Sequence, residues 1–168
     1  MANKTNKLKV YLESSFVSYF TGRETDDAKI AADQAYTRRW MKEQSGRCNL
    51  YISQFVIDES VKGPKDDVDR RLAFIEDVES VAPAPETVSV LAKRLIKEHA
   101  LPEKEITDAF HIATASVAGM DFLLTWNCRH MANPHTLPKT KSIVRQAGFH
   151  CPEIMTPFTF LSNIQLEA

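Results

Sequence analysis

Four oxygen-bearing side chains lie far apart in the sequence, each next to a segment that could build one edge of an α/β sheet. Glu13 follows the apolar run KLKVYL, and Glu59 lies in QFVIDES, directly after a second run, NLYIS. Asp108 lies early in ITDAFHIATASVAGM, and Asn127 follows DFLLTW. Hard divalent cations are bound in proteins through oxygens of this kind. Each residue alone is as readily a helix cap or a surface acid, so the joint placement is what indicates a metal site.

The elements that would position these residues follow from the spacing of apolar residues. Apolar runs predict strands at residues 7–12, 49–53, 81–84 and 121–126, and CPEIMTPFTFL predicts a last short strand and a helical turn. A short helix is predicted after each of the first two strands, the first with Ser14 or Ser15 as its N-cap. The longer predicted helices span residues 24–46, 65–79, 86–99, 102–119 and 138–147.

This alternation of strands and helices predicts parallel strands that are joined by helical crossovers. We therefore expect one domain over residues 1–168, an α/β fold arranged as a three-layer α/β/α sandwich with a central parallel sheet. Ligands of such sheets bind beyond the carboxyl ends of the strands. Glu13, Glu59 and Asn127 follow predicted strands, and Asp108 is near the opening end of a helix that could face the same edge.

The composition is that of a soluble globular protein, with 43% hydrophobic and 26% charged residues and a formal net charge of −1. No apolar run is long enough to cross a bilayer, and the polar N-terminus does not resemble a signal peptide. The three cysteines form no CxxC pair or disulfide framework. We expect a cytoplasmic protein that does not insert into membranes.

Charge is unevenly distributed along the chain. Residues 122–152 contain no Asp or Glu, and they carry four basic residues, which are Arg129, Lys139, Lys141 and Arg145. A solvated basic face explains this stretch as well as a nucleic-acid contact does. If these residues bind RNA phosphates, binding should weaken steeply with salt.

The segments YLESSFVSYF, FVIDES and ITDAFHIATASVAGMDFLLTWNCRHMANP, in this order and spacing, resemble the PIN-domain family. Within that family they are most similar to the VapC-type toxins of type II toxin–antitoxin systems. The resemblance implies a small α/β/α sandwich that cleaves RNA with Mg²⁺ or Mn²⁺. It implies that Glu13, Glu59 and Asp108 hold the ion and that all three act in catalysis with Asn127.

The same resemblance assigns supporting roles and partners. Ser15 and Thr125 match positions that shape the site. His111 is assigned from its position alone: one turn after Asp108, it is a candidate partner of the metal ligands or a hydrogen-bonded structural residue. RNA is the implied substrate, a cognate antitoxin the implied protein partner, and a homodimer the implied assembly.

Two positions depart from the usual pattern: the first acid is glutamate instead of aspartate, and Asn127 stands where many members carry a fourth acid. Three carboxylates suffice for one divalent ion, whereas a second would depend on the substrate phosphate.

Three other interpretations stay open at this point. The first is a PIN-like scaffold that binds RNA or a protein without cleaving. The second is a phosphohydrolase or receiver-like domain, which Glu13 fits poorly because such proteins need an aspartate there. The third is a zinc site, although its four residues match no common zinc spacing; these are Cys128, His130, His135 and Cys151.

Overall fold

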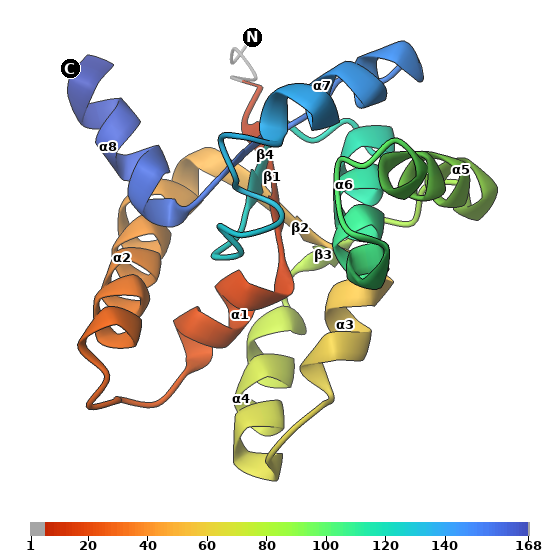
Figure 1. Ribbon diagram of the computed structural model, residues 1–168. Helices are drawn as coiled ribbons and strands as arrows, with labels where there is room; N and C mark the ends of the chain where they lie inside the picture. Colours follow the sequence, from red (N-terminus) through yellow and green to blue (C-terminus); the bar gives the residue numbers. More distant parts are fainter. Residues whose placement is uncertain (1–5, 168) are drawn as a thin grey trace, which may run out of the picture.

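Five short strands form one all-parallel sheet at the centre of the molecule (Figure 1). The computed structural model describes residues 6–167. The strand order is β3-β2-β1-β4-β5, so the first strand is central and the chain later crosses to its other side. The strands are β1 (Leu8–Leu12), β2 (Cys48–Ile52), β3 (Glu79–Ser80), β4 (Phe122–Leu124) and β5 (Glu153–Met155).

Helices cover both faces of this sheet, which confirms the predicted α/β sandwich (Figure 1). On one side α5 packs against α6 and α7, and on the other α2 packs against α1 and α8. The shorter helix α3 contacts α1, α4 and α6. The helices are α1 (Ser14–Thr21), α2 (Ala28–Gln44), α3 (Gln54–Ser60), α4 (Lys65–Ile75), α5 (Pro85–Lys97), α6 (Ile106–Val117), α7 (Leu137–Gln146) and α8 (Pro157–Glu167), with short 3-10 turns at Ser45–Arg47 and Glu103–Glu105.

Several predicted boundaries need correction. The strand expected at residues 81–84 is the two-residue β3 just before it, where two prolines that lack an N–H follow closely. The helix expected from residue 24 begins at Ala28, because the Asp27 carboxylate accepts a hydrogen bond from the Ile30 N–H at 3.0 Å. The expected terminal turn is the 11-residue helix α8. No helix within residues 6–167 is long and apolar enough to span a membrane.

The register of the central strands brings their carboxyl ends together. Leu12 pairs with Leu124, which pairs with Met155 in turn, so β1, β4 and β5 end at the same level. The chain leaves β1 toward β2, whereas β4 lies on the opposite side of β1. A crevice forms where connections diverge in this way, and it is the usual ligand site of a parallel sheet. The residues that follow β1 and β4 therefore face each other at this crevice.

Small residues let α6 approach its neighbours closely. Ala109, Ala113 and Ala115 have no exposed surface, and neither has Ile112 between them. This buried stripe is the one that the spacing of apolar residues predicts. It fixes the rotation of α6 and therefore the directions in which the polar residues of its first two turns extend.

Candidate metal site and cleft

Glu13 is both the N-cap of α1 and a member of the candidate site. Its Oε2 atom accepts hydrogen bonds from the Ser15 N–H at 3.0 Å and from the Ser15 hydroxyl. The predicted serine N-cap is therefore wrong, because the preceding glutamate satisfies the free N–H of the first turn. The side chain is 5% exposed although it carries no cationic partner among the described residues.

The residues after β4 complete the environment of Glu13. The Thr125 hydroxyl donates to Glu13 Oε2 at 2.8 Å, across the two neighbouring strands. Ser15 Oγ in turn accepts a hydrogen bond from the Trp126 N–H at 2.7 Å. Ser15 and Thr125 thus hold one oxygen of Glu13 in place.

Glu59 is oriented by a buried chain of hydrogen bonds. Its Oε1 lies 2.6 Å from His111 Nε2, and His111 Nδ1 lies 2.7 Å from the Tyr11 hydroxyl. The Tyr11 hydroxyl is also 2.7 Å from Ser53 Oγ. His111 and Tyr11 have no exposed surface. A proton on Nε2 lets His111 donate to Glu59 while its other nitrogen accepts from Tyr11, so every member of the chain is paired.

Asp108 is held by Asn127, the residue at the predicted fourth position. Asn127 Nδ2 donates to Asp108 Oδ2 at 2.9 Å, and Asn127 Oδ1 accepts from the His130 N–H at 3.0 Å. The backbone N–H of Asn127 donates to Thr125 Oγ1 at 3.0 Å. The amide is therefore fixed at both ends, and it links Asp108 of α6 to the end of β4.

Two carboxylates and one imidazole lie close enough together to hold a metal ion. One ligand atom from each of Glu13, Glu59 and His111 lies within 4.8 Å of the others. Asp108, which we predicted as the third ligand, lines the same cleft. Among residues 6–167, however, it does not belong to a group whose ligand atoms all lie within 4.8 Å of one another. His111 was predicted only as a partner of the ligands, and its Nε2 is engaged with Glu59.

The free oxygens of the carboxylates suit a cation. Glu13 Oε1, Glu59 Oε2 and Asp108 Oδ1 accept no hydrogen bond from the part of the chain that the structure describes. Each carboxylate therefore has one oxygen anchored by the protein and one available as a ligand. The buried Ser14 hydroxyl also lines the cleft and lies near Glu59, whose pKa it helps to lower. This set of donors fits a divalent ion that prefers oxygen.

The pKa values in the cleft reflect crowded negative charge. Burial, together with the nearby Glu13, raises the pKa of Asp108 to about 6, although the hydrogen bond from Asn127 acts in the opposite direction. Burial also acts to raise the pKa of Glu59, but the hydrogen bond and charge of His111 outweigh it and the pKa is lowered. Burial would lower the pKa of His111, and Glu59 reverses this, so the pKa is raised. A cation would relieve the repulsion between Glu13 and Asp108.

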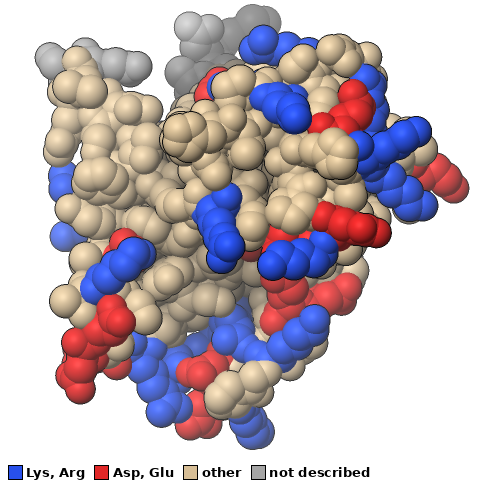
Figure 2. All heavy atoms as spheres, in the orientation of Figure 1, with Lys and Arg blue, Asp and Glu red and all other residues tan. Residues whose placement is uncertain are grey.

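The cleft is an open hollow of about 570 Å³ that contains acidic and basic residues. Its lining includes the three carboxylates, Asn127 and Ser15, together with Lys62 and Arg71. Figure 2 shows one face of the molecule, where positive and negative side chains are interspersed over the lower half. Lys62 and Arg71 were not among the predicted site residues, because neither belongs to a motif and both lie in a stretch with an acidic excess.

The predicted RNA-binding residues lie elsewhere. Arg129 is exposed in the loop after β4, and the other three lie on α7. That helix is at the top of Figure 1, away from α1, which Glu13 caps, and from α3, which carries Glu59. Lys141 forms an ion pair with Glu153 at 2.8 Å. None of Arg129, Lys139, Lys141 and Arg145 is among the described residues that line the cleft.

The alternative zinc site does not assemble in residues 6–167. Cys151 is buried, Cys128 is exposed, and His130 Nε2 lies 3.5 Å from a Glu105 carboxylate oxygen. Among residues 6–167, the potential metal ligands that lie close together are Glu13, Glu59 and His111, none of which belongs to the alternative zinc set.

The sequence matches no protein-family model, and no curated protein is significantly similar to it.

Proposed function

We propose that the protein is a PIN-type ribonuclease that hydrolyses phosphodiester bonds of RNA with Mg²⁺ or Mn²⁺. The observation that supports this most is the convergence of Glu13, Glu59 and Asp108 at the carboxyl edge of the sheet, each with one unengaged oxygen. These residues come from three separate elements, α1 and its N-cap, α3 and α6. Glu13 and Asp108 form no ion pair with any described residue, and Glu59 pairs with His111 through one oxygen only, so each keeps an oxygen that a metal could bind.

The protein residues would bind the ion and orient its ligands. Glu13 and Glu59 would hold it, with Asp108 bound directly or through water. A divalent ion at this place would lower the pKa of a bound water and neutralise charge that builds on the phosphate. His111 would keep Glu59 oriented, as the hydroxyls of Ser15 and Thr125 keep Glu13 oriented.

The amide of Asn127 has a specific role in this proposal. A fourth carboxylate beside Asp108 would repel it and raise its pKa further. The amide instead donates a hydrogen bond to Asp108, which favours the ionised form that a metal requires. The site therefore holds three carboxylates at most, which is enough for one divalent ion.

The nucleophile would be water and not a side chain. Ser15 Oγ is hydrogen bonded to Glu13 and to the Trp126 N–H, and His111 is bonded to Glu59 and Tyr11. No serine–histidine pair of the kind that activates a hydroxyl is therefore formed at this cleft by the described residues. An open polar hollow also suits a flexible single strand of RNA.

A role as the toxin of a toxin–antitoxin pair is part of this proposal, and it rests on the resemblance of the motifs to VapC-type toxins. An antitoxin would act by covering the acidic cleft. A non-cleaving scaffold on the same fold is the alternative, and metal-dependent cleavage separates the two.

The direct test is cleavage of structured RNAs with and without Mn²⁺. Wild-type protein should cleave only with the ion, and Asp108→Ala and Glu59→Gln should each lose activity by about 10- to 100-fold. Asp58→Asn is the matched control, because Asp58 is exposed beside Glu59 on the same helix and is bonded to Gln54 instead. Equal cleavage by wild type and Asp108→Ala would contradict the proposal.

A further inference from the structure

Two cations line the same cleft as the acidic residues. Lys62 lies just after α3, the helix that carries Glu59, and Arg71 lies in α4. The two helices and the turn between them therefore present a carboxylate and two positive groups to one hollow.

Neither of these two cations is held in an ion pair by the described residues, although the charge of Lys62 helps to lower the pKa of Glu59. In the neighbourhood of the cleft, the cations that do form ion pairs are Arg23, with Asp66 at 2.7 Å, and Arg70, with Asp67. Neither Lys62 nor Arg71 forms an ion pair with any described residue. The cations that face the acidic site are thus those whose charge stays available for a ligand.

Arg71 is held in a fixed orientation by backbone oxygens. Its Nε donates to the Ser60 carbonyl at 3.0 Å, and its Nη2 donates to the Lys62 carbonyl. Its Nη1 atom donates to none of the residues that the structure describes. A guanidinium fixed in this way loses little conformational entropy when it binds an anion.

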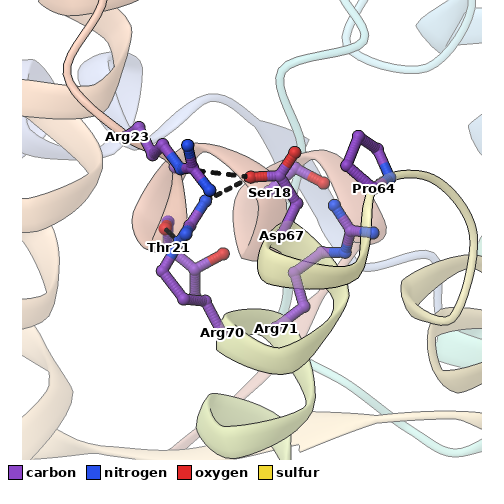
Figure 3. A pocket seen from close by; sticks show the side chains of 8 residues that line it. Ser18, Thr21, Arg23, Pro64, Asp67, Arg70 and Arg71 are labelled. Atoms are coloured by element: carbon purple, nitrogen blue, oxygen red, sulfur yellow. Dashed lines mark hydrogen bonds and ion pairs between the residues drawn. The ribbon is translucent and has the colours of Figure 1, made fainter.

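The cleft continues into a second hollow of about 430 Å³ that shares Ser18 and Arg71 with it. Figure 3 shows this hollow between α1 and α4, with the guanidinium of Arg71 beside Pro64. It also shows Arg23 and Arg70 joined to Asp67, on the other side of the hollow from Arg71. Arg71 therefore lies at the junction of the two hollows, on a path that leads away from the carboxylates.

We propose that Lys62 and Arg71 bind the phosphodiester group that neighbours the scissile one on a single strand of RNA. This inference rests on the proposed function. A polyanion is repelled by three carboxylates, so a strand that reaches them needs positive groups at the same cleft. An arginine fork matches phosphate oxygens, and a lysine adds a point charge. The lining of both hollows is mostly polar or charged, unlike the aromatic and apolar centre of a protein interface.

The test is binding of a fluorescent single-stranded oligoribonucleotide in EDTA, where metal-dependent cleavage cannot occur. Lys62→Ala should weaken binding by about fivefold to tenfold and reduce the salt slope by about 0.7. Arg71→Lys should weaken binding with little change in that slope, because it keeps the charge and loses the fork. The control is the double variant Lys139→Ala/Arg145→Ala on α7, which should bind as wild type does.

The outcomes separate this inference from the proposed function. If wild type binds RNA but Lys62→Ala binds equally well, the inference fails and the ribonuclease proposal stands. If wild type does not bind RNA in EDTA, the inference fails, and cleavage with Mn²⁺ decides the ribonuclease proposal separately. Inorganic phosphate and an acidic peptide serve as competitors: displacement by either as effectively as by unlabelled RNA would assign the two cations to a free phosphate or to a protein partner instead.

Discussion

A single carboxylate can cap a helix and bind a metal because it has two oxygens. Glu13 uses Oε2 for the first turn of α1 and for Thr125, and Oε1 has no partner among the described residues. The two explanations for an acid at this position in the sequence are therefore compatible. The longer side chain of glutamate, compared with aspartate, lets one residue reach its own helix and the neighbouring strand.

Asp108 destabilises the metal-free fold at neutral pH. Its pKa is about 6 in the folded protein and 3.8 ordinarily. The folded state therefore binds the proton more tightly than the unfolded state does. The stabilisation that comes from this tighter proton binding is fully present below pH 3.8, and it is lost as the pH rises through about 6.

Asp108→Asn should consequently stabilise the metal-free protein at neutral pH, by about 1–2 kcal/mol after allowance for solvent screening. Near pH 4 the same substitution should change the free energy of unfolding little, because aspartate is then protonated. Urea unfolding of wild type and Asp108→Asn at the two pH values measures the change in the free energy of unfolding at each. An equal effect at both pH values would show that the charge of Asp108 is not the cause.

At the scale of elements, the turn between α3 and α4 decides which charges meet at the cleft. Gly63 in this turn has a φ of 98°, a conformation that residues with a side chain rarely adopt. The turn reverses the chain so that Arg71 of α4 reaches the carbonyls of Ser60 and Lys62. The backbone of one glycine thereby supports the position of both cations.

Gly63→Ala should lower the free energy of unfolding by about 1 kcal/mol, because alanine is strained at positive φ. It should also weaken binding of the oligoribonucleotide, since the carbonyls that hold Arg71 would shift. Gly46→Ala is the matched control: a Cβ there has open space around it, and the φ of this glycine is not positive. That control should be neutral or slightly stabilising in the same unfolding and binding measurements.

At the scale of the whole molecule, a metal should stabilise the fold by linking three elements. At 100 times the dissociation constant, a bound ion adds about 2.7 kcal/mol to the free energy of unfolding. For 168 residues this corresponds to a rise in Tm of about 5–10 °C. A thermal melt with increasing Mn²⁺ measures it.

Glu13→Gln should remove most of that rise without lowering the melting temperature measured in the absence of Mn²⁺, because the amide oxygen can still cap α1 and the repulsion of Asp108 is relieved. An equal rise in both proteins would place the ion elsewhere. The exposed large apolar residues are spread over five parts of the chain, and only Phe158 and Leu166 of α8 share an element; the others are Leu8, Val61, Val90 and Ile106. Self-association and an antitoxin partner stay predictions.

Much of the fold and part of the site could be predicted from the sequence. The alternation of apolar runs and helical periods determined the α/β class, and the rule that strand exits share an edge determined that Glu13, Glu59 and Asn127 meet. These inferences depend on neighbours along the chain and on parallel topology. The exact ends of β3, α2 and α8 depend on caps and prolines that compete within a few residues. The predicted ends were therefore less accurate than the predicted order of strands and helices.

Only the tertiary structure decided which side chains touch. The pairing of His111 with Glu59, and of Asn127 with Asp108, depends on how α6 is rotated and how closely its small residues let it pack. Likewise, the basic residues at the cleft are Lys62 and Arg71 and not those of the acid-free stretch. Sequence spacing cannot show this, because contacts between elements depend on crossover path and helix orientation, which are set by packing of the whole core.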